Sequence, residues 1–273
     1  MDIRTSSIVL VSVVKKYKFL IVIVKMFNKQ PEFLKRLVYF IYQSKFLRTL
    51  FTPLKSFYHQ YVAAVANRRR KNFVKNGLDV LSAFDKCLTE NGFAYSLAFG
   101  TMLGAVREKG LIKHDFDLDV VLWEEDYTLN LRELLEKVGF RLEHELLVDE
   151  GRKGREETYI LNGVTIDIFY IYPAIDEHPY CCDFYKCEGS VSFEDSMRKF
   201  GHIKARRLQM PWKKDFIRVP FETLKLPICS NAHEILTFRY GIDYMIPNPQ
   251  WNCLEENKFV TIWKEELATW SRK

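Results

Sequence analysis

The stretch that decides the fold runs from residue 99 to residue 122 and reads FGTMLGAVREKGLIKHDFDLDVVL. Its first half, Gly100–Arg107, is typical of a turn that leads from a short strand at 94–99 into a short helix. Its second half alternates polar and apolar residues, which predicts a strand over 117–122. Because successive side chains of a strand point to opposite faces, Asp117 and Asp119 share one face while Leu118 and Val120 enter the core.

On either side of residues 99–122, between residues 72 and 273, hydrophobic periodicity and turn signals predict the other elements. Asn162-Gly163 between two alternating runs is a strong type I′ hairpin signal. Strands are expected at 140–148, 157–161 and 164–172, and helices at 72–91, 124–138, 231–241 and 255–270. Residues 173–215 show no regular pattern. Strands mixed with helices, without a clean βαβ repeat, favour an α+β fold in which helices flank a mixed sheet.

Four aspartates are the candidate catalytic residues. Asp115, Asp117 and Asp119 alternate, and Asp167 interrupts the otherwise apolar strand Thr165–Phe169. Like charges on one strand face repel each other unless a cation lies between them, and oxygen ligands suit Mg²⁺ or Mn²⁺. We therefore expect Asp117, Asp119 and Asp167 to bind the metal, with Asp115 supporting them or adding a ligand. The alternative is a solvated strand face without a metal.

Residues upstream of these aspartates are candidates for binding phosphate. Gly100 and Thr101 open a helical turn, where glycine permits close approach and backbone N–H groups attract anions. Gly104 either joins this cradle or is a packing glycine. The planar fork of Arg107 fits phosphate, although a salt bridge to one of the aspartates is the alternative. Phosphate binding beside a metal site predicts phosphoryl transfer.

The charge of the 273-residue chain is distributed unevenly. Residues 1–76 hold 16 Lys and Arg against Asp2 and Glu32, a formal charge of +14; the remainder holds 25 against 33, or −8, and the two parts sum to +6. The excess of positive charge therefore belongs to a leader, residues 1–71, and not to a nucleic-acid-binding core in 72–273.

The leader is rich in aromatic residues and is expected to be largely helical from Pro31, with a kink or break at Pro53. It either lies on an anionic membrane surface or packs on the body. Its apolar runs are too short to span a bilayer, and no secretory signal is recognisable.

The six cysteines form no disulfide framework, which favours free thiols in a reducing cytosol. His178, Cys181, Cys182 and Cys187 leave open a metal site in a loop, but their spacing matches no standard zinc pattern.

The motifs of the body resemble the LicD/fukutin-related family of the nucleotidyltransferase superfamily. The resemblance rests on Gly100-Thr-x-Leu-Gly-Ala-Val-Arg107, Ile112-x-x-Asp-x-Asp-x-Asp119 and Val164-x-Ile-Asp-Ile-Phe-x-x-Tyr172, and it continues through Met210-Pro-Trp-Lys, Val219-Pro-Phe-Glu222 and Arg239-Tyr-Gly-x-Asp-Tyr-Met-x-Pro247. It covers about residues 75–250. Lys113-His114 stands where the family often has Pro-Trp, so the approach to Asp115 differs.

The resemblance implies a nucleotidyltransferase-like fold and a Mg²⁺-dependent phosphotransferase. Such an enzyme transfers a phospho-alcohol, such as phosphocholine or ribitol phosphate, from a CDP-linked donor to a glycan hydroxyl and releases CMP. Its setting would be the biosynthesis of cell-surface polysaccharide, lipopolysaccharide or glycoconjugates. Asp167 would then be the third metal ligand or the general base.

Two other functions compete with this one. A generic nucleotidyltransferase would move a nucleoside monophosphate to a small molecule, and a non-catalytic scaffold would use a degenerate fold at a membrane surface. The leading hypothesis places the protein in the cytoplasm, peripherally on the cytoplasmic face of a membrane, where a lipid-linked glycan acceptor would be found. No nucleic-acid partner is expected.

Overall fold

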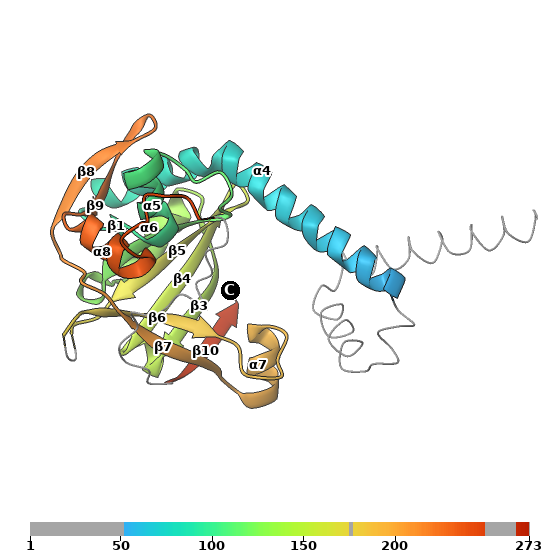
Figure 1. Cartoon of the computed structure of the whole chain (residues 1–273). Coiled ribbons are helices and arrows are strands. Elements are labelled where there is room, and N and C mark those ends of the chain that lie inside the picture. The colour runs from blue at the N-terminus through green and yellow to red at the C-terminus, as the bar shows by residue number, and fades with distance from the viewer. Residues whose placement is uncertain (1–51, 175–176, 249–265, 273) are drawn as a thin grey trace, which may run out of the picture. The chain divides into compact units, whose positions relative to one another are not determined.

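The computed structural model describes residues 52–174, 177–248 and 266–272 (Figure 1). Two compact units divide the chain, Met1–Tyr61 and Val62–Lys273, and the description below concerns the second. The predictions for residues 1–51 lie outside the described residues. The expected division into a leader of residues 1–71 and a body of residues 72–273 stays a prediction.

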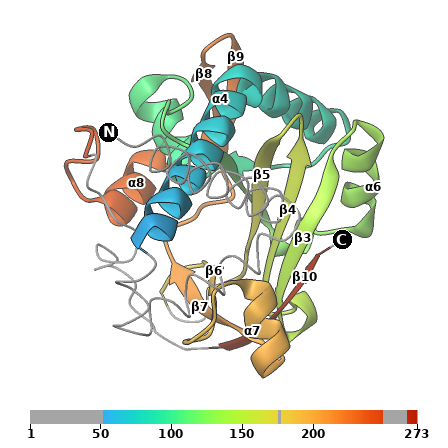
Figure 2. The same ribbon diagram turned by 90° about the vertical axis from the view of Figure 1, so that its right-hand side faces the viewer.

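A mixed sheet of eight strands forms the centre of the described unit (Figures 1 and 2). Its spatial order is β1-β2-β5-β4-β3-β10-β7-β6, and β2 and β5 are its one parallel pair among the described strands. The strands are β1 Ser96–Leu97, β2 Asp117–Trp123, β3 Arg141–Val148, β4 Gly154–Leu161, β5 Val164–Ile171, β6 Tyr180–Tyr185, β7 Ile203–Gln209 and β10 Glu266–Arg272. A bridge between Tyr172 and Tyr180 joins the end of β5 to the start of β6, so the sheet curls.

The helices are α4 Thr52–Glu90, α5 Phe99–Leu103, α6 Leu129–Lys137, α7 Phe193–Phe200 and α8 Ala232–Tyr240. Short turns add a π-helical segment at Gly104–Glu108 and 3₁₀ turns at Glu124–Asp126 and Asp149–Gly151. Strands β8 Phe216–Phe221 and β9 Leu224–Cys229 form a separate hairpin, in which β9 contacts β1. Helices and a mixed sheet in this arrangement confirm the α+β class.

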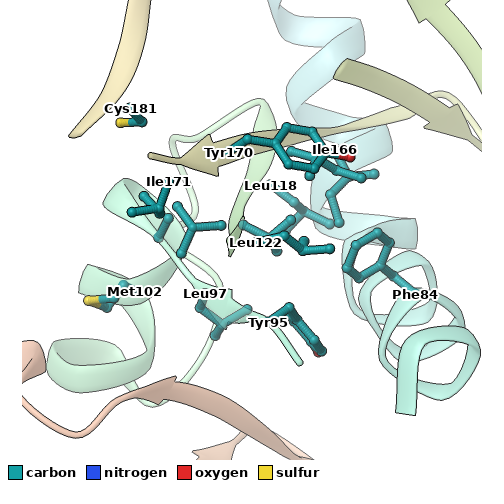
Figure 3. Packing of buried hydrophobic residues seen from close by; sticks show 14 of the residues in the cluster. Phe84, Tyr95, Leu97, Met102, Leu118, Leu122, Ile166, Tyr170, Ile171 and Cys181 are labelled. Atoms are coloured by element: carbon teal, nitrogen blue, oxygen red, sulfur yellow. The ribbon is translucent and has the colours of Figure 1, made fainter. Parts of the chain in front are cut away.

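The core forms where apolar positions of β2 and β5 meet the helices (Figure 3). Leu118 and Leu122 of β2 and Ile166 of β5 are fully buried, as strand alternation predicts. Phe84 of α4 packs edge-on against Tyr95, with ring centroids 5.4 Å apart. The aspartates alternate with these buried residues and therefore lie on the opposite face of β2 and β5.

The predicted hairpin between β4 and β5 is confirmed. Leu161 pairs with Val164, and Asn162 and Gly163 both have positive φ, 51° and 77°. A type I′ turn requires positive φ at both central residues, which asparagine and glycine tolerate best.

Helix α4 differs from the prediction at its start. The expected helix at 72–91 begins at Thr52 and runs without interruption to Glu90, so it crosses the expected boundary at residue 71. Pro53 lies in the first turn of α4, where its missing N–H is not needed; the kink or break predicted there concerns a helix from Pro31, whose part before residue 52 lies outside the described residues. Among the described residues, no helix has both the length and the apolar run needed to cross a membrane.

Three further predictions about secondary structure are wrong or incomplete. Residues 173–215 are not irregular, because they contain β6, α7 and β7. The end of the expected helix at 255–270 is strand β10 instead, which pairs with β3 and β7, while 249–265 lie outside the described residues. The expected helix at 124–138 is a 3₁₀ turn followed by α6, interrupted at Tyr127 and Thr128.

Candidate active site

The parallel register of β2 and β5 brings the predicted carboxylates together. Asp119 lies directly opposite Asp167, and Asp117 lies opposite Thr165. Neighbouring strands are about 4.8 Å apart, and residues two apart on a strand share a face, so Asp117, Asp119 and Asp167 project from one face of the sheet. Each is only half-buried, while the residues that alternate with them on the other face are buried.

Hydrogen bonds from residues 98–101 fix the backbone of the strand that carries Asp119. The backbone N–H of Asp119 donates to Thr101 Oγ1 at 2.8 Å, and the N–H of Ala98 donates to the carbonyl of Asp119 at 2.9 Å. Thr101 is buried, and the hydrogen bond that its hydroxyl accepts fixes the strand that carries Asp119.

Gly100 allows the carboxylates to approach the turn closely. A Cβ atom at Gly100 would lie 3.0 Å from Asp115 Oδ2 and 3.6 Å from Asp119 Oδ2. The backbone of Gly100 also forms a hydrogen bond with the Asp119 carboxylate. A side chain at residue 100 would therefore press on Asp115 and displace its carboxylate.

Phe99 turns the chain into α5 with a φ of 41°, in the left-handed region that residues with a Cβ rarely adopt. Its ring packs edge-on against Phe169 at 4.9 Å and against Trp212 at 6.0 Å. Such strain costs on the order of 1–3 kcal/mol and persists where the surroundings impose it, often at functional sites.

Gly104 and Arg107 lie next to this turn but have structural partners. A Cβ at Gly104 would lie 2.5 Å from the carbonyl oxygen of Gly110, which makes residue 104 a packing glycine. Arg107 Nε donates to Glu108 at 2.8 Å, and Nη1 donates to the carbonyl of Tyr244 at 3.2 Å. Arg107 still acts electrostatically on Asp115, whose pKa it lowers.

Burial raises the pKa values of the four aspartates, and repulsion from neighbouring aspartates adds to this effect for Asp115, Asp119 and Asp167. Burial is the first cause in each case; it raises the pKa of Asp115 to about 6 and that of Asp167 to about 7. The pKa of Asp119 is raised well above its ordinary value by burial, and then by Asp117 and Asp167. Four acids that resist ionisation beside one another form a site that a divalent cation would stabilise.

Sequence reasoning missed three polar side chains of the same sheet face. Thr158 of β4, which pairs with Asp167, donates to Asp167 Oδ1 at 2.5 Å, and its Oγ1 lies 3.1 Å from His144 Nε2. Glu156 lies two residues before Thr158, and its pKa is raised by burial and next by Asp167. The predicted hairpin could have identified Thr158 and Glu156, because a two-residue turn that pairs Leu161 with Val164 also pairs Thr158 with Asp167, whereas His144 follows only from the place of β3 beside β4.

The structure also adds a positively charged side chain to the site, from the segment that sequence analysis placed in the leader. Arg69 of α4 is the first opposing charge on Asp117, whose pKa it lowers against the effect of burial, and it also lowers the pKa of Asp167.

Within the described residues, no group of three or more His, Cys, Asp or Glu side chains is already arranged to hold a metal ion. The carboxylates therefore do not form a preformed cage. Mg²⁺ is commonly held by one or two carboxylates together with water and substrate phosphates, and the Asp119–Asp167 pair with Asp117 beside it offers such donors. Hence the residues fit a divalent cation whose remaining ligands come from water and from the phosphates of the substrate.

The cysteines do not support a second metal site. Cys181 and Cys182 are adjacent on β6 and point to opposite faces, and the five described cysteines are buried free thiols. Burial raises the pKa of both Cys181 and Cys182, so neither favours the thiolate that binds a metal.

Comparison with known proteins gives a consistent result. A family model described as LicD/FKTN/FKRP, nucleotidyltransferase domain, matches residues 92–231, which contain β2, β5 and all four aspartates. An uncharacterised protein, RP689 of Rickettsia prowazekii, is 26% identical over 232 residues, covering 76% of this chain and 85% of that protein. Human ribitol-5-phosphate transferase FKTN is 22% identical over 219 residues, which cover 77% of this chain but 41% of that protein.

Proposed function

Because the chain belongs to the LicD/FKTN/FKRP family, we propose that this transferase moves a phospho-alcohol from a CDP-linked donor to a glycan hydroxyl. The observation that carries the proposal is the parallel register that sets Asp119 against Asp167, with Asp117 on the same face. The name of the human relative supports a polyol phosphate as one candidate for the transferred group, and phosphocholine is another.

Mg²⁺, or Mn²⁺ in its place, would be held by Asp117 and Asp119, with Asp167 as the third ligand or the general base. When bound, the cation neutralises the charge that develops on the donor phosphates. The residues of the chain supply the remaining functions. Gly100 and Thr101 hold Asp119 in place, and the phosphates of the donor would lie next to their turn.

Asp167 is well placed to accept the proton of the acceptor. Thr158 donates to Oδ1 of Asp167 and so fixes the carboxylate while Oδ2 remains for the proton. The oxygen of the glycan hydroxyl bonds to the phosphorus that carries the alcohol. The bond from that phosphorus to the bridging oxygen breaks, and CMP leaves with that oxygen.

The decisive experiment incubates the purified chain with CDP-ribitol, CDP-choline or nucleoside triphosphates, each with a glycan acceptor and Mg²⁺. Release of CMP together with an acceptor mass gain of one phospho-alcohol is expected. Release of pyrophosphate from CTP or ATP would favour the generic nucleotidyltransferase instead. No turnover, together with a melting temperature that neither Mg²⁺ nor CDP changes, would favour the non-catalytic scaffold.

The basic leader supports a second part of the proposal, peripheral association with the cytoplasmic face of an anionic membrane. Its charge of +14 within residues 1–76 is the supporting observation. The intact chain should pellet with vesicles that contain an anionic lipid and should not pellet with neutral vesicles. Failure to pellet with either would refute the membrane assignment and leave the proposed chemistry untouched.

A further inference from the structure

The C-terminal half of α4 is fixed against the turn that joins β4 to β5. Asn76 Nδ2 donates to the carbonyl of Asn162 at 2.9 Å, and Phe73 is buried in the core. A Cβ at Gly163 would lie 2.8 Å from Asn72 Nδ2, so helix and turn are in close contact. These contacts set the rotation of α4 about its axis.

That rotation also determines where Arg69 lies. Arg69 precedes Asn72 by three residues and Phe73 by four, so it lies on the helix face that contacts the body. The next residue, Arg70, has its Cζ 5.3 Å from the centre of the Phe116 ring. Phe116 directly precedes β2, so this turn of α4 lies beside the start of the strand that carries Asp117 and Asp119.

Arg69 is exposed on the face of α4 that contacts the body, in the helical turn that lies beside Phe116 and therefore beside the start of the strand with Asp117 and Asp119. It forms no ion pair with another residue of the described part of the chain. An exposed guanidinium within electrostatic reach of a cluster of acids keeps its five N–H donors available to a ligand.

We propose that Arg69 binds a phosphate oxygen of the diphosphate in the CDP-linked donor. This assignment rests on the proposed function and adds a substrate-binding residue from α4. A guanidinium presents a planar fork that matches two phosphate oxygens, and it is never deprotonated at working pH. The nearby carboxylates attract the Arg69 guanidinium to the site before the donor binds. The diphosphate of the donor then replaces the carboxylates as its partner.

The competing role for Arg69 is to neutralise Asp117 and Asp167 without touching substrate. The two roles differ in their dependence on phosphate. A residue that contacts the diphosphate affects the affinity for CDP and not for cytidine, whereas a neutralising residue affects neither once Mg²⁺ is saturating.

The test measures binding of CDP and of cytidine to the full chain by calorimetry in saturating Mg²⁺. Arg69→Ala should weaken CDP binding by about tenfold to a hundredfold, the usual effect of losing one charge-assisted contact, and change cytidine binding by less than about twofold. Arg69→Lys keeps the charge and should recover part of the loss. The matched control is Arg68→Ala, which removes the same charge from the neighbouring exposed position and should leave CDP binding within about twofold.

Three results would overturn the assignment. Equal CDP affinity in Arg69→Ala and the wild type would show that Arg69 does not contact the diphosphate. A raised KM for the acceptor with unchanged CDP affinity would place Arg69 on an acceptor phosphate instead. If the wild type binds no CDP at all, the proposed function fails and Arg69 has no donor to bind.

Discussion

Replacing Asp167 by asparagine should stabilise the metal-free protein at pH 8, although it removes a residue of the proposed active site. Burial raises the pKa of Asp167 from 3.8 to about 7. Its protonated form is therefore favoured in the fold. The stability that this gives is complete below the ordinary pKa of about 4 and is lost as the pH rises through 7.

The magnitude follows from the shift. One pKa unit corresponds to about 1.4 kcal/mol, so holding the charged carboxylate at pH 8 costs the fold roughly 4 kcal/mol at most. Asparagine removes this cost but weakens the hydrogen bond from Thr158, whose loss of charge assistance takes away about 1 kcal/mol. We expect a net gain of roughly 2–3 kcal/mol, which raises Tm by about 4–10 °C for a domain of this size.

The assay is thermal unfolding in EDTA at pH 8 and at pH 4.5. At pH 4.5 Asp167 is protonated in the fold and the gain should be close to zero. Asp79→Asn is the matched control, because it removes the same charge from an exposed position of α4 and should leave Tm unchanged at both pH values. A variant destabilised at pH 8, or stabilised equally at both pH values, would refute the electrostatic reasoning.

Three further outcomes follow from the geometry. Thr158→Val removes the hydrogen bond that lowers the pKa of Asp167, so the acidic limb of the kcat/KM profile should move to higher pH, whereas Thr158→Ser should leave it in place. Gly100→Ala places a Cβ 3.0 Å from Asp115 Oδ2 and should reduce turnover by about tenfold or more while circular dichroism shows the fold intact; wild-type turnover would contradict this. Gly163→Ala forces alanine into a φ of 77° beside Asn72 and should lower the free energy of unfolding by about 1 kcal/mol or more in urea titrations, with activity per folded molecule unchanged.

The sequence predicted well those parts of the fold that local pattern determines. Leu118 and Ile166 lie in alternating runs, and Asn162-Gly163 has one favoured turn geometry, so β2, β5 and the hairpin could be identified. The sequence indicated that Asp167 joins Asp117 and Asp119 in one site, but the parallel pairing of β2 with β5 and its register follow only from the packed sheet.

The segments that were missed depend on distant partners. In β7, Arg206 and Arg207 point to opposite faces and hide the alternation of its buried residues. In β10 only Ala268 is fully buried, and the strand gains its hydrogen bonds from β3 and β7, which lie far away in the sequence. Such strands are defined by tertiary pairing rather than by local periodicity.

The residues missed in the site have two origins. His144 lies on β3, whose place beside β4 follows only from the packed sheet, whereas the Asn162-Gly163 hairpin already implied that Thr158 pairs with Asp167. Arg69 belongs to a basic run that composition assigned wholly to a leader. Its charge lowers the pKa of Asp117 and that of Asp167 against the larger effect of burial, so part of the leader's positive charge acts on the site.

Metal-dependent transfer is tested by the rate of CMP release from a CDP-linked donor by EDTA-treated protein, measured before and after Mg²⁺ is added. We expect release that requires Mg²⁺ and that falls to less than about a tenth in Asp119→Ala or Asp117→Ala, because these carboxylates would hold the cation. Asp79→Ala should release CMP at the wild-type rate. Release that is independent of Mg²⁺, or a folded Asp119→Ala variant that retains more than about a tenth of the wild-type rate in saturating Mg²⁺, would contradict the account.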